Sequence, residues 1–318
     1  MDLLVRVERT CAADCSDREL RERLVALLRE RLPFEGHMFA MTDPVTGVAS
    51  SPHATVPMLP WPELPGLVRT RHLTPERTAW NTYLSRFGVT DTAHVAFADR
   101  HGRWGWLELW RVRGRYDDRE RRLLAQLAPT ITRGLRAASA RTFAARDPAL
   151  SPVPPGVVLL DDGLRVLDQT DAAAQALLRL LPPPGADASM APIPAAAYNA
   201  GAALVAAEAG LWPTDPSSRV HLGGNRWVTV RAARLGAGIA VAIAPATAEE
   251  RTDLFARVHG LSPRETEVLG LVLQGLGTPE IAARLVLART TVEDHVKALL
   301  AKTGSPSRQV LLARALGT

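Results

Sequence analysis

The chain has 318 residues, 47% of them hydrophobic and 22% charged, which excludes a disordered chain and is enough for two or three domains with buried cores. Its net charge of +5 permits nucleic-acid binding without requiring it. Two cysteines, Cys11 and Cys15, exclude a disulfide framework, and we find neither a signal peptide nor a long apolar run, so we expect a cytoplasmic protein without a membrane segment.

Residues 1–146 are predicted to form an α+β domain. Ser16 and Glu19 mark the start of an amphipathic helix, two hairpins are expected over 36–51 and 92–112, and a long helix follows from Asp117. Because alternate residues of a strand share a face, four residues of the second hairpin should lie together: Trp104, Trp106, Glu108 and Trp110. This face would either line a ligand pocket or pack in the core.

Residues 147–156 have the composition of a linker, and residues 157–245 are predicted to form a second, smaller α+β domain. Its pattern is strand, turn, strand and helix, then an alanine-rich helix and three closing strands joined by glycine-rich turns. The segment "VVLLDDG" at 157–163 resembles the acidic pair that opens a phosphate-accepting receiver domain. A receiver also needs a lysine, and none precedes Lys297, so we interpret the acidic pair as a turn.

Motifs that would indicate an enzyme are missing. The sequence contains no G-x-S-x-G, H-E-x-x-H or C-x-x-C, no P-loop and no dinucleotide-binding fingerprint after a strand. We therefore predict a protein that is not an enzyme, with no catalytic residue, metal site or cofactor.

Residues 246–254 are predicted to be a second linker, and residues 255–318 an all-α domain of four short helices. Ser262, Pro263 and Glu265 are typical of a helix start, and Thr278 with Pro279 is expected to cap the second helix. The third helix is predicted from about 290 to 303, where Gly304 ends it.

The third helix carries both lysines of the chain, Lys297 and Lys302. The other 36 of the 38 Lys and Arg residues are arginines. Its apolar residues Val292, Val296 and Leu299 should face the core. Thr290, Glu293, Asp294, Lys297 and Ala301 then lie on the opposite face. Two short helices joined by a tight turn have the geometry that places the second helix in the major groove of DNA.

The stretches "LSPRETEVLGLVLQGLGTPEIAARL" and "TTVEDHVKALLAKTG", followed by "SR", resemble the LuxR-type helix-turn-helix of bacterial transcription regulators over about residues 255–317. The resemblance implies double-stranded DNA as a partner and a helix-turn-helix proper at about 278–297. It implies groove contacts from Glu293, Asp294 and Lys297. It implies phosphate contacts from Thr290, Thr291, Lys302, Ser307 and Arg308.

The chain departs from this family at two positions. Many members have serine where this chain has Ala288, and many have Lys or Arg where it has Glu293. A carboxylate in the groove repels phosphate but can accept a hydrogen bond from cytosine N4. The alternative is that Glu293 and Asp294 are ordinary acids at a helix start, where the helix dipole stabilises them.

The hairpin and helix of the first domain resemble a GAF-type sensor domain, and residues 156–245 resemble a PAS-like domain. The whole chain is thus predicted to be a bacterial transcription regulator, with the two sensor domains modulating the helix-turn-helix. We expect a homodimer, leave open a small-molecule effector and a contact with RNA polymerase, and expect no membrane partner. The competing hypothesis is an interaction module whose helix-turn-helix no longer binds DNA.

Overall fold

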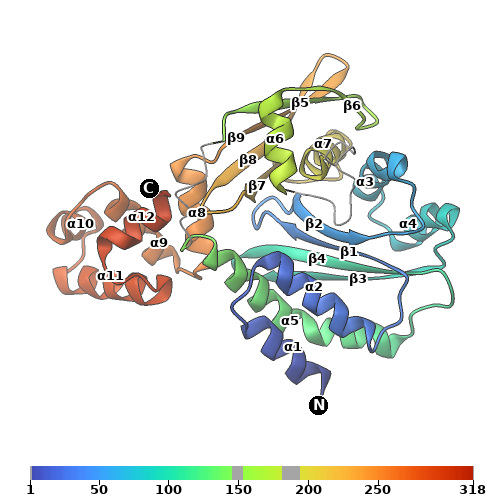
Figure 1. Ribbon diagram of the computed structural model, residues 1–318. Helices are drawn as coiled ribbons and strands as arrows, with labels where there is room; N and C mark the ends of the chain where they lie inside the picture. The colour runs from blue at the N-terminus through green and yellow to red at the C-terminus, as the bar shows by residue number, and fades with distance from the viewer. Residues whose placement is uncertain (1, 145–152, 181–193, 318) are drawn as a thin grey trace.

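The computed structural model of the protein describes residues 2–144, 153–180 and 194–317. Two antiparallel sheet domains form the body of the molecule, and a lobe of short helices projects from it (Figure 1). Across the described residues, no helix has both the length and the apolar character needed to cross a membrane.

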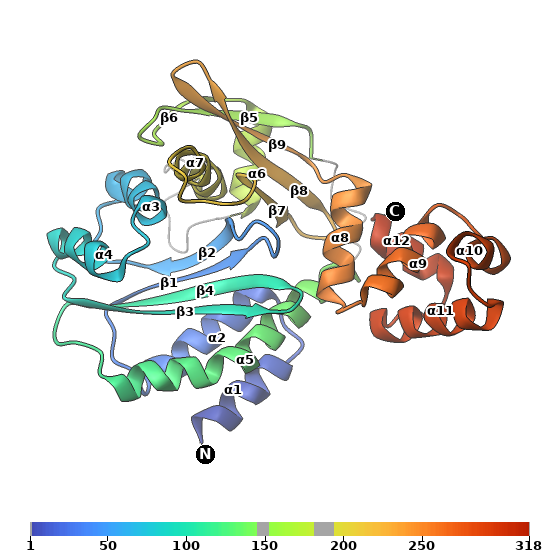
Figure 2. The ribbon, with the colours of Figure 1, turned by 180° about the vertical axis from the view of Figure 1, so that it is seen from behind.

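The first sheet has four strands in the order β2-β1-β4-β3, and all its pairings are antiparallel. One face is covered by α1, α2 and α5, and the other carries α3 and α4 at one end (Figures 1 and 2). The strands are β1 (Gly36–Thr42), β2 (Ala49–Thr55), β3 (Asp91–Asp99) and β4 (Gly102–Arg111). The helices are α1 (Leu3–Ala12), α2 (Asp17–Arg29), α3 (Leu64–Leu73), α4 (Arg77–Leu84) and α5 (Asp118–Arg141). Both predicted hairpins are present, as β1–β2 and β3–β4.

The second sheet has five strands in the order β6-β5-β9-β8-β7, again all antiparallel. The three closing strands predicted from the sequence are β7, β8 and β9. The elements are β5 (Gly156–Leu160), β6 (Val166–Gln169), α6 (Asp171–Leu180), α7 (Ala195–Glu208), β7 (Ser217–His221), β8 (Trp227–Leu235) and β9 (Gly238–Pro245). This arrangement fits the predicted multidomain α+β N-terminal part with a helical C-terminal part.

Helix α7 is shared between the two domains. It belongs to the second domain by sequence, yet it contacts α3 and β2 of the first domain as well as β7, β8 and β9. Eleven of its 14 residues are buried, which is why its sequence is alanine-rich on every side and not amphipathic. Small side chains also allow close packing, since a Cβ on Gly201 would lie 2.9 Å from Leu164. The two sheet domains are therefore joined by a buried, closely packed helix.

Arg219 joins three parts of the chain. From β7 it donates to both carboxylate oxygens of Asp43 in the β1–β2 turn, at 2.6 and 3.0 Å, and to Asp253 Oδ2 of α8 (Ala248–Val258) at 2.7 Å. Both Arg219 and Asp43 are buried. Burial opposes ionisation of Asp43, but Arg219 outweighs it and holds the pKa of this carboxyl below its ordinary value. The contact links the first domain, the second domain and the helix that leads to the C-terminal lobe.

His37 of β1 is a buried polar side chain whose ring nitrogens have no hydrogen-bond partner among the described residues. Burial, with smaller contributions from His53 and Arg29, lowers the pKa of His37 to about 4. In the unfolded chain the pKa returns to about 6.5. Between these values the unfolded chain binds a proton that the folded chain does not, so stability is lost as the pH falls from about 6.5 towards 4.

We therefore expect His37→Leu to reduce the acid sensitivity of folding. Between pH 7.5 and 5.0 the wild type should lose about 2 kcal/mol more free energy of unfolding than the variant. Urea denaturation of both proteins at the two pH values measures this difference. Other buried histidines contribute equally in both proteins and cancel. Equal losses in the two proteins would show that folding does not lower the pKa of His37.

Candidate functional site

The C-terminal lobe is built from α8 and four further helices. These are α9 (Pro263–Leu273), α10 (Thr278–Leu285), α11 (Arg289–Thr303) and α12 (Arg308–Leu316). Ser262 caps α9 and Glu265 completes the capping box, as predicted. The prediction that Thr278 caps α10 is wrong: Gly277 is the N-cap, and its N–H donates to Glu280 Oε2 at 2.6 Å. Thr278 is the first helical residue and has another partner, Arg308.

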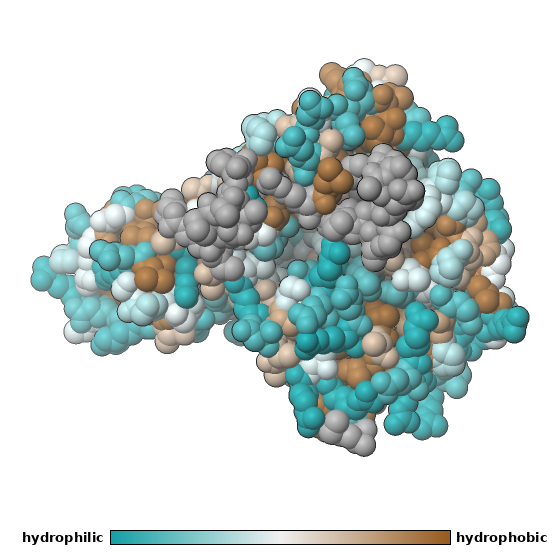
Figure 3. Space-filling model, in the orientation of Figure 1, coloured by the Kyte–Doolittle hydropathy of each residue, from teal (hydrophilic) through white to brown (hydrophobic). Residues whose placement is uncertain are grey.

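The face of α11 that the sequence assigns to DNA is open to solvent. Glu293, Asp294 and Lys297 are exposed, whereas Val292, Val296 and Leu299 are buried. Lys297 and Asp294 lie 3.6 Å apart with about three quarters of each side chain exposed, so water screens this pair and leaves the ammonium accessible. Figure 3 shows the lobe projecting from the body, and α11 lies along one edge of it in Figures 1 and 2.

Lys302 is placed differently from Lys297. Its Nζ donates to Glu265 Oε2 at 2.7 Å, and Glu265 is buried at the start of α9. Burial opposes ionisation of Glu265, but Lys302 and Ser262 outweigh it and hold its pKa below the ordinary value. The phosphate contact expected for Lys302 thus competes with an ion pair inside the lobe. The sequence pattern did not predict this ion pair.

The other residues expected to contact phosphate lie at helix starts. Thr290 is exposed and Thr291 half-buried in the first turn of α11, whose N-cap Ala288 supplies no side-chain hydrogen bond, as the departure at this position implies. Ser307 is the N-cap of α12, and Arg308 donates to Thr278 Oγ1 at 2.8 Å. The structure therefore brings the start of α12 to the start of α10, and free N–H groups at helix starts favour anions.

Val286, in the turn between α10 and α11, has a φ of 53° and a side chain that is 90% exposed. A β-branched residue in this left-handed region is strained. We expect Val286→Gly to stabilise the lobe by about 1 kcal/mol, with Val286→Ala as the matched control that keeps a Cβ and gains less. Native-state hydrogen exchange of the α10 and α11 amides measures the change. A destabilised glycine variant would contradict this account of the turn.

The four residues predicted to form a ligand face do not share one. Opposite β4, Phe97 pairs with Gly105 and Ala98 with Arg103, so Trp104 is an extra residue in a β-bulge. The bulge turns Trp104 into the core beneath the helices of the first domain, where its Nε1 donates to Asp99 Oδ1 at 3.0 Å. Trp106, Glu108 and Trp110 keep the opposite face. The predicted alternation of faces therefore holds from Trp106 to Trp110 and is wrong at Trp104.

Glu108 is engaged in the core. Its Oε1 accepts hydrogen bonds from Trp80 Nε1 at 2.9 Å and Trp110 Nε1 at 2.7 Å, and Arg71 lies 3.6 Å from Oε2. Trp110 packs with Trp80 and Leu84 of α4. Only Trp106 is half-exposed, and it lines a cavity between the first sheet and α7.

Two α+β sheet domains are followed by a helical lobe in which α10 and α11 form a helix-turn-helix whose second helix is open to solvent. Residues 259–315 match the model of the bacterial regulatory proteins of the luxR family. A 55-residue segment is 49% identical to the response regulator Rre1 of Synechocystis sp., covering 17% of this chain and 24% of that protein. The lobe is therefore a LuxR-family helix-turn-helix domain.

The comparisons do not extend this likeness to the sheet domains. The chain spans about a quarter (24%) of the length of the curated relative that it matches. The crystal structure of SdiA of Escherichia coli aligns over 99% of this chain and 96% of its own, at 11% identity and a TM-score of 0.35. SdiA in complex with octanoyl-rac-glycerol aligns with a TM-score of 0.36 over 93% of its own length. Such scores do not establish a shared fold.

Proposed function

We propose that the protein is a sequence-specific, DNA-binding transcription regulator in which two N-terminal sensor domains modulate the LuxR-type lobe. The observation that carries this proposal is the open face of α11, with Lys297 exposed at its centre in a matched LuxR-family domain. Lys297, Glu293 and Asp294 would contact the groove. Thr290, Thr291, Ser307 and Arg308 would contact phosphates, together with Lys302 where the Glu265 ion pair allows it.

The sensor domains are proposed to be GAF-like over residues 1–146 and PAS-like over 157–245, with linkers at 147–156 and 246–254. Most of the first linker lies outside the described residues, and most of the second is helical, in α8 (Ala248–Val258). We propose that the protein is cytoplasmic, acts as a homodimer and responds to a small molecule, and that it contacts RNA polymerase when bound to a promoter. Because α11 is already exposed, an effector would act less by uncovering it than by changing the spacing of two lobes in a dimer.

A second candidate function is protein binding through a helix-turn-helix that has lost DNA affinity. The two exposed acids, Glu293 and Asp294, favour it because they repel phosphate. If Glu293 reads a base, Glu293→Ala should change the base preference of DNA binding. If Glu293 only repels phosphate, the same substitution should strengthen DNA binding.

The test is selection of genomic DNA fragments by the full chain, with wild type, Glu293→Ala and Lys297→Ala side by side. The regulator proposal predicts enriched fragments that share a motif, weaker enrichment by Lys297→Ala and a changed base preference at one position for Glu293→Ala. Random fragments with the wild type would contradict the regulator and favour the protein-binding alternative. An unchanged motif with Glu293→Ala would show that Glu293 does not read a base.

A further inference from the structure

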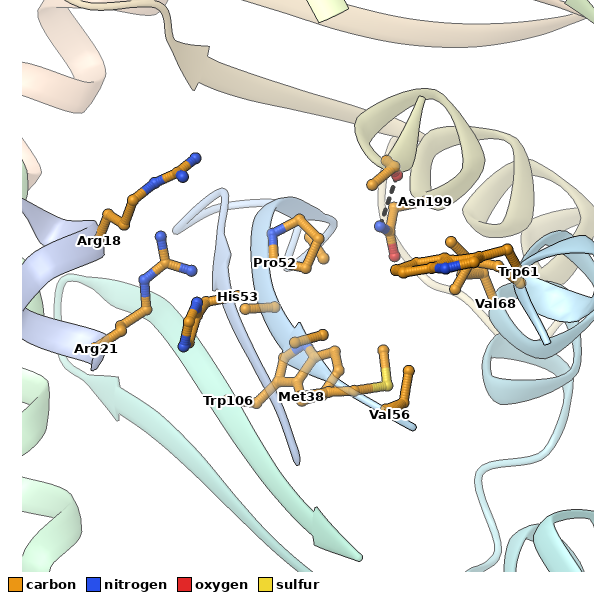
Figure 4. Close-up of a pocket in the computed structure, with 15 residues that line it drawn as sticks. Arg18, Arg21, Met38, Pro52, His53, Val56, Trp61, Val68, Trp106 and Asn199 are labelled. Carbon is orange, nitrogen blue, oxygen red and sulfur yellow. Dashed lines mark hydrogen bonds between the residues drawn. The ribbon is translucent and has the colours of Figure 1, made fainter. Parts of the chain in front are cut away.

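A cavity of about 100 Å³ lies between the first sheet and α7 (Figure 4). Met38, Ala40 and Trp106 come from the sheet, Val68 from α3, and Asn199 from α7 of the second domain. The cavity is therefore made by both domains, and neither would enclose it alone.

Most of the lining is apolar. Besides the residues already named, it includes small and aliphatic side chains and one aromatic ring: Ala49, Pro52, Ala54, Val56, Trp61, Leu64 and Ala195. An engineered apolar cavity of about 150 Å³ stays dry and binds benzene, so a space of this order suits a ring or a short alkyl chain. The lining predicts a ligand whose body is apolar.

Two arginines line one end of the cavity. Arg18 and Arg21 extend from α2 towards it, and His53 lies beside them (Figure 4). Arg21 is fully used, since it donates to Asp17, to the carbonyl oxygens of Phe39 and Ser51 and to Ser51 Oγ. Arg18 is half-buried and has no hydrogen bond or ion pair in the described part of the chain. Among the described lining residues there is no carboxylate to neutralise it.

At the other end, Asn199 supplies a neutral polar group. It is 7% exposed, and its Nδ2 donates to the carbonyl oxygen of Ala195 at 2.8 Å (Figure 4). An amide has two donors and one acceptor, so one N–H and Oδ1 remain for a ligand.

We propose that this cavity binds a small organic carboxylate, with its apolar body between Trp106 and α7 and its carboxylate on Arg18. A guanidinium that has no partner among the described residues, at the end of an apolar space, matches one anionic group in both charge and geometry. Because the ligand touches both domains, binding holds α7 against the first sheet and fixes the domain arrangement. The regulatory consequence rests on the proposed function, whereas the binding itself does not.

The experiment is calorimetric titration of the full chain with 3-phenylpropanoate and with its neutral match, 3-phenylpropanamide. The variants are Arg18→Gln, Arg18→Lys and the control Arg23→Gln, which removes an exposed cation of the same helix that pairs with Glu19. Wild type and Arg23→Gln should bind the carboxylate roughly tenfold more tightly than the amide. Arg18→Gln should abolish this difference, and Arg18→Lys should keep part of it.

Failure of the carboxylate to bind the wild type, or equal binding of both probes by all four proteins, would overturn the carboxylate site. DNA affinity measured with and without the carboxylate separates the two proposals. Arg18-dependent binding without any change in DNA affinity supports the site and removes the sensor role. Fragment-specific DNA binding by a chain that binds neither probe removes the site and leaves the DNA-binding proposal standing.

Discussion

Arg219→Leu should lower the free energy of unfolding by about 3–5 kcal/mol, because it leaves the carboxylate of Asp43 buried without its counter-charge. The guanidinium makes two bonds to that carboxylate, and the Arg219 backbone N–H adds a third at 3.0 Å. Its Nη1 also holds Asp253 Oδ2 and the carbonyl oxygen of Glu250 at 2.7 and 2.9 Å. No other cation of the described residues hydrogen-bonds to Asp43, so the loss is not compensated.

Chemical denaturation of the full chain measures this loss. Arg231→Leu is the matched control on the neighbouring strand, since Arg231 is half-exposed and pairs with the exposed Asp215 at 2.8 Å. It should cost less than about 1 kcal/mol. The Arg219 variant should also separate the unfolding of the first domain from that of the rest, because the contact between Asp43, β7 and α8 is gone. Equal small losses in both variants would show that Arg219 does not hold the domains together.

Replacement by methionine should affect different properties at the two lysines: the stability of the lobe at Lys302 and DNA affinity at Lys297. Lys302→Met removes the partner of the buried Glu265 carboxylate and should destabilise the lobe by about 1–3 kcal/mol. Lys297→Met should leave stability unchanged, because its side chain is 75% exposed and pairs only weakly with Asp294. It should instead weaken DNA binding about tenfold and reduce the salt dependence by about one counterion.

Two measurements on each protein separate these effects. Hydrogen exchange of the α9 and α11 amides reports stability, and titration of an enriched DNA fragment reports affinity. Glu265→Gln provides a further check, since a neutral amide no longer needs the ammonium and should make Lys302→Met nearly harmless. A Lys302→Met lobe as stable as the wild type would refute the ion pair's structural role. Full DNA affinity in Lys297→Met would remove Lys297 from the groove.

The C-terminal lobe was the most predictable part of the molecule because its signals are local. A serine followed by proline and glutamate starts α9, glycine ends α11, and apolar residues at helical spacing face the core. The error there was the cap of α10: Thr278 was assigned from spacing alone, whereas its partner Arg308 comes from another helix. The partner of Lys302, Glu265, also comes from another helix and was not predicted.

The sheet domains show what local patterns could not supply. The hairpins were predicted, but one extra residue in β4 reversed the face of Trp104; the available signal was Gly105, since an isolated glycine inside a strand often marks a bulge. The partners Asp43 and Arg219 are 176 residues apart, so no periodicity could pair them. The alanine-rich helix was expected. Its position between two domains was not expected, although a helix that is apolar on all sides must be buried on all sides.

The most direct test of the account is the salt dependence of DNA binding by the full chain. Affinity for one enriched genomic fragment and one random fragment of equal length would be measured from about 50 to 200 mM salt. We expect a steep linear fall of log affinity with log salt for both fragments, and tighter binding of the enriched fragment at every salt concentration. Binding that is independent of salt, or equal for the two fragments, would contradict a sequence-specific DNA-binding function.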